Sequence, residues 1–424
     1  MQLASFFFDC LKLTLIPSFT PTGKRCGTIF LTVNAVTNYL EYNWDFTTYC
    51  ITVPDVLTIK YKSNEGPEKT LHRIFTYGKL EGYVLTNITF GHPRFPGNWN
   101  RNDTNPLLGS HCFPFWIQSE YRNEILDEDC LKIEPSWMAN YGQLRIGSMM
   151  IPGTHDSGAW TSNYISLIEQ FLLTQDYNLW GQLVSGIRYF DIRVGIYYSE
   201  TTIEWINHGL FKCSKMREEL QHLAQFLKLS PKEVVILHMN KFEHPPNFLN
   251  KEHSLILNLL QEILGEFILP RSYFYSTDGP KLEEIWQTGR NLIISYNNED
   301  LVKEHDWLWY NINQKWGDTT NVDDLRNYLD KVKNDHVHPQ SPFCALMAEL
   351  TPNLDYIINN LDKGLRYMAD EVNPNLNVWL TKFNWSDVVN IVATDFFLGN
   401  TAISVSIEAN NRKLENMEKS KDIF

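Results

Sequence analysis

The feature that most constrains the fold is a repeated change of hydrophobic pattern in the second part of the chain. From about residue 141 onward, short apolar runs of strand character alternate with stretches of helical periodicity over roughly 270 residues. Such alternation is typical of an α/β domain with a mostly parallel sheet. Because the apolar runs number about eight, we expect a TIM-like (β/α)8-type barrel over residues 141–410, with a doubly wound sheet as the alternative.

The preceding residues, 21–140, follow a different pattern. Stretches such as TIFLTVNAV and GYVLTNITF are rich in β-branched and aromatic residues, and turn-forming stretches such as SNEGP separate them. This pattern predicts a small all-β, sandwich-like domain. We expect it to have a structural or interaction role, because no cluster of ionisable residues follows its apolar runs.

The two ends of the chain carry weaker signals. Residues 1–20 are apolar, but Asp9 interrupts them and no basic stretch precedes them, so we expect either a divergent signal peptide or an extra strand. Residues 411–424 are polar, and we expect a tail there. No apolar stretch reaches the roughly 18–20 residues that a membrane-spanning helix needs. We therefore expect no transmembrane segment.

Cysteine and sequon positions favour a secreted glycoprotein, with a cytoplasmic location as the alternative. Five of the seven cysteines lie in the first 130 residues, where disulfides would stabilise a loop-rich β region. Two pairs there are placed to form bridges: Cys26 with Cys50, and Cys112 with Cys130. Three N-glycosylation sequons occur, at Asn87, Asn102 and Asn384.

The charge and the missing motifs exclude several function classes. A net charge of −13 argues against a nucleic-acid partner, which would need a basic surface. The chain has no glycine-rich phosphate loop, no GxSxG, no CxxC and no HExxH. We therefore expect no cofactor and no metal, and the sequence says nothing about oligomeric state.

Ionisable residues follow several of the predicted barrel strands. In a barrel, active-site residues lie at the carboxyl ends of the strands. Each residue alone has an ordinary structural explanation, such as a turn histidine or a buried ion pair. Their convergence on one rim predicts a catalytic site. Its expected members are His155, Asp156, Arg193, His208 and Asp395.

This set of side chains suits the cleavage of a phosphodiester. One histidine can take a proton from an attacking hydroxyl and the other can give a proton to the leaving oxygen, each role contributing about 100- to 10,000-fold in rate. An arginine can stabilise the non-bridging oxygens as charge builds up on them. Carboxylates can fix the tautomer of a histidine and stabilise its charged form.

Four stretches together resemble the X domain of phosphatidylinositol-specific phospholipases C. They are IPGTHDSG, IRYFDIRV, NHGLF and EVVILHMNKFEH, and their order and spacing fit over nearly all of residues 140–410. The chain is most similar to the X domain-containing proteins and to the bacterial enzymes. Stretches such as CLKIEPSWM also resemble an N-terminal β module of arthropod members.

The resemblance implies a TIM-like barrel and a phosphoric diester hydrolase or lyase that acts on a phospholipid at a membrane surface. It implies that His155 is the general base, oriented by Asp395, and that His208 is the general acid, assisted by Asp156. It implies that Arg193 stabilises the phosphate. Calcium-dependent relatives have metal ligands at the positions of Asp156 and Arg193. Because an arginine would repel Ca²⁺, we expect cleavage without metal.

The expected head-group pocket departs from the bacterial pattern. Asn240 aligns with a lysine that binds the inositol ring in the bacterial enzymes, and Lys241 is expected to face the other way on its strand. Either Tyr296 or Ser295 stands at the position of a second basic residue of those enzymes, and Trp316 is expected to form an aromatic platform for the sugar. Two alternatives stay open: a catalytically idle lipid- or glycan-binding barrel, and a metal-dependent enzyme of the glycerophosphodiesterase type.

Overall fold

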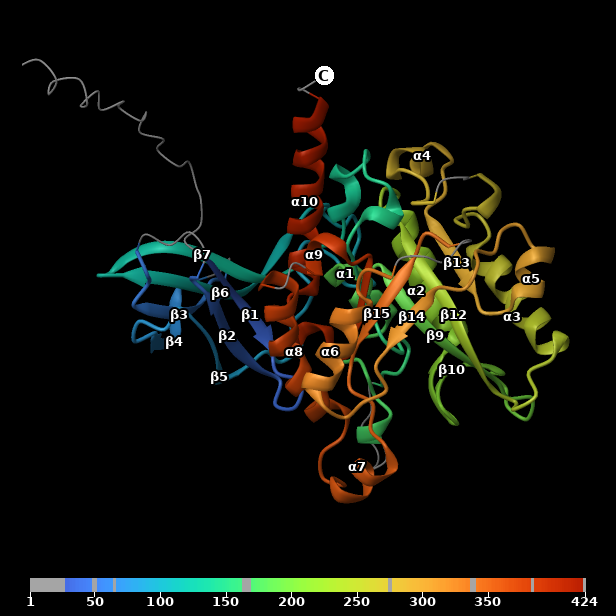
Figure 1. The fold of residues 1–424 in the computed structure, drawn as a ribbon, viewed down its shortest axis with the longest axis horizontal. Helices are drawn as coiled ribbons and strands as arrows, with labels where there is room; N and C mark the ends of the chain where they lie inside the picture. The colour runs from blue at the N-terminus through green and yellow to red at the C-terminus, as the bar shows by residue number, and fades with distance from the viewer. Residues whose placement is uncertain are drawn as a thin grey trace, which may run out of the picture.

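The computed structural model describes residues 27–47, 52–63, 66–161, 169–273, 277–335, 341–382 and 385–421. Strands β1 to β7 lie together at one side of the molecule, and the α/β part of the chain lies at the other (Figure 1). The expected leader at residues 1–20, the Cys26–Cys50 bridge and the sequon at Asn384 fall outside the described residues.

A sheet of parallel strands forms the centre of the α/β part. Neighbouring strands pair in the order β13, β12, β9, β8, β16, β15, β14. Their bounds are β8 (Ile151–Thr154), β9 (Tyr189–Ile196), β12 (Val235–His244), β13 (Leu292–Tyr296), β14 (Asn313–Trp316), β15 (Cys344–Ala348) and β16 (Ile391–Thr394). Every residue of β9 is buried, as expected for a parallel strand covered on both faces.

The sheet is barrel-like, but it is less regular than the expected (β/α)8 barrel. Between β13 and β14 the described residues form one isolated bridge, from Ser295 to Trp309, in place of a ladder. A hairpin of β10 (Glu204–His208) and β11 (Phe211–Lys215) is added to the sheet, with β10 antiparallel to β9. The structure therefore confirms an α/β fold with a curved parallel sheet, and the hairpin was not predicted as such.

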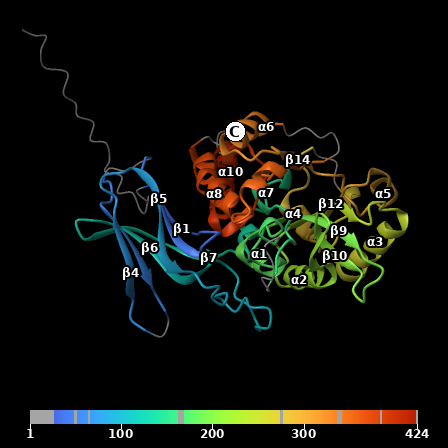
Figure 2. The same cartoon turned by 90° about the horizontal axis from the view of Figure 1, so that it is seen from below.

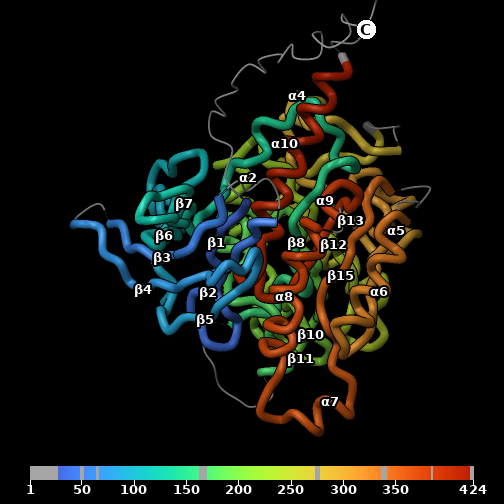
Figure 3. The backbone as a smooth tube through the Cα atoms, turned by 60° about the vertical axis from the view of Figure 1, so that its left-hand side comes forward, coloured from blue at the N-terminus to red at the C-terminus, as the bar shows by residue number. Residues whose placement is uncertain are grey.

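Helices connect the strands and surround the sheet (Figure 3). Those between the strands are α1 (Leu179–Ser185), α2 (Met216–Leu229), α3 (Asn250–Leu264), α4 (Leu282–Gln287), α5 (Glu299–Glu304), α6 (Val322–Val332), α7 (Leu354–Asn359), α8 (Leu365–Lys382) and α9 (Trp385–Val388). The helical pattern before α1 is only partly realised, because its described residues hold one 3-10 turn, Glu169–Phe171. Short 3-10 turns also occur at Trp137–Asn140, Ile146–Ser148, Arg271–Tyr273 and Phe397–Gly399.

The last helix, α10 (Ala402–Lys421), runs through the expected boundary of the polar tail. The expected tail from residue 411 is thus helical as far as Lys421. Its first half packs on the barrel, since Ala402 and Ala409 belong to the same apolar cluster as α8. Within the part of the chain that the structure describes, no helix has both the length and the apolar character needed to cross a membrane.

The strands before the barrel form two antiparallel sheets. One sheet has the order β1 (Thr28–Val33), β2 (Tyr39–Asp45), β5 (Glu81–Thr89), and the other has the order β4 (Lys69–Phe75), β3 (Val56–Tyr61), β6 (His111–Tyr121), β7 (Glu124–Ile133). Apolar residues of both sheets, such as Tyr42 and Ile117, lie in one buried cluster. The division of the chain into a separate β domain and a barrel stays a prediction.

Buried contacts join these sheets to the α/β part. Helices α8 and α10 lie next to the β-rich side in both views (Figures 1 and 2). The carboxylate of Asp370 on α8 accepts hydrogen bonds from the backbone N–H groups of Ala35 and Val36, at 2.7 and 3.2 Å. The indole of Trp180 on α1 donates to the carbonyl of Trp99 at 2.9 Å. The same apolar cluster continues from the two sheets into the barrel.

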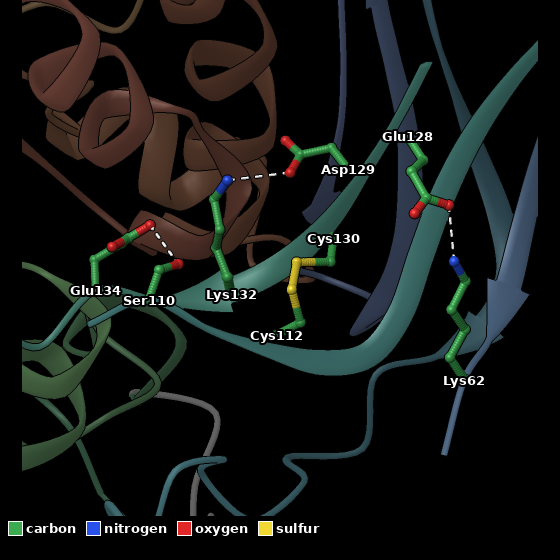
Figure 4. Close-up of a disulfide and its surroundings, with 8 residues drawn as sticks. All are labelled: Lys62, Ser110, Cys112, Glu128, Asp129, Cys130, Lys132 and Glu134. Atoms are coloured by element: carbon green, nitrogen blue, oxygen red, sulfur yellow. Dashed lines mark hydrogen bonds and ion pairs between the residues drawn. A yellow bond between two sulfur atoms is a disulfide. The ribbon is translucent and has the colours of Figure 1, made fainter. Parts of the chain in front are cut away.

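The expected bridge between Cys112 and Cys130 is present and joins β6 to β7 (Figure 4). Polar contacts surround it: Lys132 donates to Asp129 at 3.1 Å, and Ser110 donates to Glu134 at 2.8 Å. The bridge therefore holds two neighbouring antiparallel strands close to the point where the chain enters the barrel. The sequons at Asn87 and Asn102 are exposed.

Candidate active site

His155 lies directly after β8 and is held by a carboxylate from the neighbouring strand end. Its Nδ1 is 2.9 Å from Oδ1 of Asp395, which directly follows β16. Both residues are almost completely buried. The parallel pairing of β8 with β16 places the two strand ends side by side. The contact places the Nδ1 proton on the side of Asp395 and leaves Nε2 available for proton transfer.

The Nε2 atom of His155 accepts from the Arg193 guanidinium, with Nη2 at 2.7 Å. This contact requires the neutral ring, because a protonated Nε2 would point its hydrogen at a cation. The nearby carboxylates favour the protonated ring instead. Burial lowers the pKa of His155, but Asp395 and Glu349 outweigh burial and raise the pKa to about 9. The site thus holds a basic imidazole whose reactive nitrogen is shielded by a guanidinium.

Asp156 turns the chain sharply at the end of β8. Its φ of 37° lies in the left-handed region, which a residue with a side chain adopts at a cost. Its backbone N–H donates to Oδ2 of Asp191 at 3.1 Å, which holds the turn. Its own carboxylate oxygens accept no hydrogen bond from the described residues. Burial raises the pKa of Asp156 to about 7, against the lowering effect of Arg193.

Arg193, on β9, is the cation at the centre of the site. Its guanidinium lies 3.4 Å from Asp156 and 3.9 Å from Asp191, and its pKa is raised because these carboxylates outweigh burial. Asp191 and Arg193 are two residues apart on a strand, so they point to the same face. A fixed guanidinium in this position can hold a phosphate without a metal ion.

His208 reaches the same site from the hairpin. It is the last residue of β10, which runs antiparallel to β9 and therefore returns toward the barrel mouth. Its ring centroid is 6.4 Å from that of His155, and the rings are nearly perpendicular. Its Nδ1 donates to the carbonyl of Leu172 at 2.7 Å and lies 3.7 Å from Asp156. Burial and then Arg193 lower the pKa of His208 to about 4.

Asn240 is buried inside the barrel, where its amide group donates hydrogen bonds to other side chains of the protein. Its Nδ2 donates to Asp191 and to the side chain of Gln314, both at 2.9 Å. Gln314 in turn donates to Asp191 and to the hydroxyl of Tyr189, both at 3.0 Å. The structure therefore places Asn240 beneath the site, where it supports Asp191.

Lys241 does not face away from the site, contrary to the expectation. A β-bulge on β12 shifts the register, so that Met239 pairs with Ile192 and Lys241 pairs with Arg193. The ammonium of Lys241 then lies 5.3 Å from the ring centroid of Trp316 on β14. Trp316 is 42% exposed, so a ligand can reach it. The structure thus brings these two expected residues together.

Tyr296 is not part of this group. It is completely buried on β13, and its hydroxyl contacts Nδ1 of His253 on α3 at 2.7 Å. Rings of Phe242 and His253 pack against it at 4.9 and 5.7 Å between centroids. Tyr296 therefore faces the helical layer, and the structure does not bring it to the barrel mouth. The neighbouring Ser295 donates to the carbonyl of Tyr310 at 2.8 Å.

Two carboxylates of the site were missed in the sequence. Glu349 directly follows β15, and its Oε1 lies 3.9 Å from Nε2 of His155. Glu243 lies on β12, and burial raises its pKa to about 7 against the effect of Arg193. Glu349 lies near the end of the apolar run CALMAEL, and its position after a predicted strand was a usable signal.

Comparisons with known proteins show which proteins the chain is similar to. No protein-family model matches the chain. The chain is 25% identical over 317 residues to PI-PLC X domain-containing protein 1 of Homo sapiens, covering 67% of this chain and 95% of that protein. It is 26% identical over 320 residues to PI-PLC X domain-containing protein 3 of Homo sapiens, covering 69% of this chain and 96% of that protein.

A solved structure shares the fold. The phosphatidylinositol-specific phospholipase C from Listeria monocytogenes superposes with a TM-score of 0.51 at 20% identity, covering 65% of this chain and 98% of that one. Over 67% of its length, the chain is therefore similar to the PI-PLC X domain-containing proteins, as its four motifs predict.

Proposed function

We propose that this protein cleaves the phosphodiester of a phospholipid such as phosphatidylinositol by histidine acid–base catalysis. The observation that carries the proposal is a pair of histidines, His155 and His208, with ring centroids 6.4 Å apart beside one guanidinium. A pure binding site does not need two imidazoles in this arrangement. Similarity to proteins named PI-PLC X domain-containing supports the same class of reaction.

The first step uses His155 as the base. Its Nε2 takes the proton from a hydroxyl of the head group, and that oxygen attacks the phosphorus. The imidazolium that forms is stabilised by Asp395, which contacts Nδ1 at 2.9 Å. For this step the guanidinium of Arg193 must leave Nε2, and the arriving phosphate offers it oxygen atoms to bind instead.

The second proton transfer uses His208 as the acid. The bond between phosphorus and the diacylglycerol oxygen breaks, and His208 gives that oxygen a proton. Burial and then Arg193 lower the pKa of His208 to about 4. A bound phosphate brings negative charge next to the ring and offsets the effect of Arg193, so the pKa rises toward the range an acid needs. Asp156, 3.7 Å from Nδ1, assists in the same direction.

Cleavage without metal follows from the charge at the centre of the site. Arg193 lies 3.4 Å from Asp156 and 3.9 Å from Asp191, so it occupies the side of these carboxylates that a cation would take. A guanidinium there repels a divalent ion and supplies positive charge to the phosphate itself. Lys241 and Trp316, at the mouth, are the side chains that we assign to the head group.

The location that fits best is the secretory pathway or the cell exterior. The Cys112–Cys130 bridge needs an oxidising compartment, and the sequons at Asn87 and Asn102 are accessible. The two sheets before the barrel have no place in the proposed chemistry, and we assign them a structural or interaction role.

The test is cleavage of phosphatidylinositol in vesicles, with and without EDTA, by the wild-type protein, His155→Ala and His208→Ala. His92→Ala serves as a matched control, because His92 is an exposed histidine outside the barrel. We expect both site variants to lose activity and the control to keep it. Equal activity in all four proteins would contradict the catalytic assignment. Loss with EDTA would contradict the metal-free mechanism, and vesicle binding without cleavage would support an idle barrel.

A further inference from the structure

A short segment before α1, residues 172–175, contacts both histidines of the site. The carbonyl of Leu172 accepts from Nδ1 of His208 at 2.7 Å. The side-chain amide of Gln175 donates to the carbonyl of His155 at 3.0 Å. None of the residues of this segment is ionisable. The segment can therefore act on the proposed reaction only by holding other groups in place.

Gln175 joins the ends of two neighbouring strands through one nitrogen atom. Its Nε2 donates to the carbonyl of His155 at 3.0 Å and to the carbonyl of Thr394 at 2.9 Å. The side chain is 1% exposed, and its other amide atom, Oε1, accepts no hydrogen bond from the described residues. Because a buried polar atom without a partner is costly, packing alone does not favour a glutamine here. The two hydrogen bonds from Nε2 are what this side chain contributes.

The sheet does not hold the proposed base and its carboxylate partner by itself. The pairing of β8 with β16 ends at Thr154 and Thr394. One further hydrogen bond, of 3.1 Å, joins the N–H of His155 to the carbonyl of Thr394. The carbonyl of His155 and the whole of Asp395 lie beyond that bond. The amide of Gln175 therefore bridges the two chains where the pairing stops.

The 172–175 segment is itself anchored on both sides of this junction. The hydroxyl of Thr174 donates to the carbonyl of Asp156 at 2.8 Å, and its N–H donates to the carbonyl of Ala159 at 3.0 Å. Its carbonyl accepts from the N–H of Phe396 at 2.8 Å. The segment is thus bonded to the chain after β8 and to the chain after β16. Because its backbone is anchored in this way, the glutamine amide restrains the two carbonyls that it binds.

The bridge determines the distance between His155 and one of its charged neighbours. The ionisable side chains around the ring of His155 are Asp395, Glu349, Arg193, His208, Asp156 and Asp191. Burial lowers the pKa of His155, and Asp395 and then Glu349 outweigh burial and raise it to about 9. Glu349 follows β15, whereas Asp395 directly follows the residue of β16 that Gln175 binds.

We propose that Gln175 is a positioning residue, whose amide keeps the ends of β8 and β16 at the separation at which Asp395 contacts Nδ1 of His155. The proposal rests on the proposed function and adds the residue that keeps the general base beside its carboxylate. Without the two donors the strand ends can move apart, which weakens the attraction between imidazolium and carboxylate. At an effective dielectric constant of about 20, moving the charges from about 4 to about 5 Å apart lowers the pKa of the imidazole by roughly half a unit.

The experiment measures kcat/KM for phosphatidylinositol vesicles against pH in the wild type and in Gln175→Met, which keeps the length of the side chain and removes its donors. We expect the acid limb of the profile to move to lower pH by roughly half a unit. The plateau should fall about 10- to 100-fold, because the base is displaced. Gln175→Asn, whose shorter amide cannot bridge both carbonyls, should move the limb in the same direction. An NMR titration of His155 without substrate should give the same shift.

Gln182→Met is the matched control. Gln182 is also a completely buried glutamine, and its Nε2 also donates to two backbone carbonyls, those of Ser157 and Tyr177, at 2.8 and 2.7 Å. We expect this variant to lose stability as Gln175→Met does, but to keep the limb at the wild-type pH. In an Asp395→Asn background, Gln175→Met should not move the limb further, because the charge through which it acts is gone.

A limb at the wild-type pH in both Gln175 variants would overturn the proposal. An equal shift in Gln182→Met, or a shift that persists in the Asp395→Asn background, would overturn it as well, because Gln175 would then not act through Asp395. A folded wild type that does not cleave the lipid, but whose His155 titration still shifts in Gln175→Met, would overturn the proposed function and leave the positioning role. The two failures are therefore distinguishable.

Discussion

Replacing Asp395 by asparagine is the sharpest test of the catalytic dyad. The amide keeps an oxygen that can accept from Nδ1 of His155, so the geometry survives while the charge disappears. Charges about 4 Å apart at an effective dielectric of 20 interact by about 4 kcal/mol. That energy corresponds to a fall of about three units in the pKa of His155.

The expected result is a change in the shape of the pH profile as well as in the rate. A general base works when it is unprotonated, so kcat/KM of the wild type should rise with pH through the pKa of His155, about 9. In Asp395→Asn this limb should move to lower pH by about three units. The plateau should fall about 100- to 10,000-fold, because the imidazolium is no longer stabilised.

The loss should therefore be largest at high pH and smaller near neutrality, where more of His155 is neutral in the variant. The assay is release of the water-soluble head-group phosphate from phosphatidylinositol vesicles across the pH range in which both proteins stay folded. Asp362→Asn is the control, because it removes an exposed carboxylate far from β16 in the sequence. An acid limb at the same pH in the wild type and in Asp395→Asn would refute the reasoning.

Three further predictions concern buried charges. Arg193→Lys keeps the positive charge but loses the planar guanidinium, which can donate two hydrogen bonds to a phosphate. We therefore expect kcat/KM to fall about 100- to 1,000-fold while vesicle binding is unchanged in a sedimentation assay. Asp191→Asn should lower the free energy of unfolding by about 3–5 kcal/mol in urea titrations at neutral pH. Although burial raises the pKa of Asp191, Arg193 and then His155 hold it below 3.8, so this stability is present above that pH and is lost as the pH falls. The difference in the free energy of unfolding between the wild type and Asp191→Asn should therefore become smaller in acid. A difference that stays constant with pH would contradict this prediction. Arg188→Met removes the guanidinium that donates to the buried Glu233 at 2.8 Å, and it should lower the free energy of unfolding by about 3–5 kcal/mol. Adding Glu233→Leu should restore most of this free energy in the double variant. A double variant no more stable than Arg188→Met would contradict the assignment of the loss to the ion pair.

The sequence predicted the main members of the site because parallel strands bring their carboxyl ends to one edge. His155 follows β8, Arg193 lies on β9 and Asp395 follows β16, and the structure brings all three into contact. His208 also arrives there, but for a different reason. It ends a strand that runs antiparallel to β9, a return that the spacing of apolar residues does not reveal.

The head-group side was harder to predict because it depends on register. One bulge on β12 turns Lys241 toward Trp316, and no pattern in VILHMNKFEH marks it. Tyr296 was wrongly expected near the substrate, since a single-residue offset along β13 decides which face a side chain takes. Glu349 was overlooked because it stands alone between two apolar neighbours, Ala348 and Leu350.

The contacts between the two sheets and the barrel determine whether the barrel could be separated from the N-terminal strands. A chain shortened to the barrel would expose Trp180, whose indole donates to the carbonyl of Trp99. It would also remove the two backbone N–H groups, of Ala35 and Val36, that donate hydrogen bonds to the carboxylate of Asp370. Exposed aromatic surface of this kind promotes aggregation. The barrel of this protein therefore cannot be moved to another protein by itself. A recombined chain, natural or engineered, has to include the N-terminal strands or replace the apolar residues of the surface that they cover.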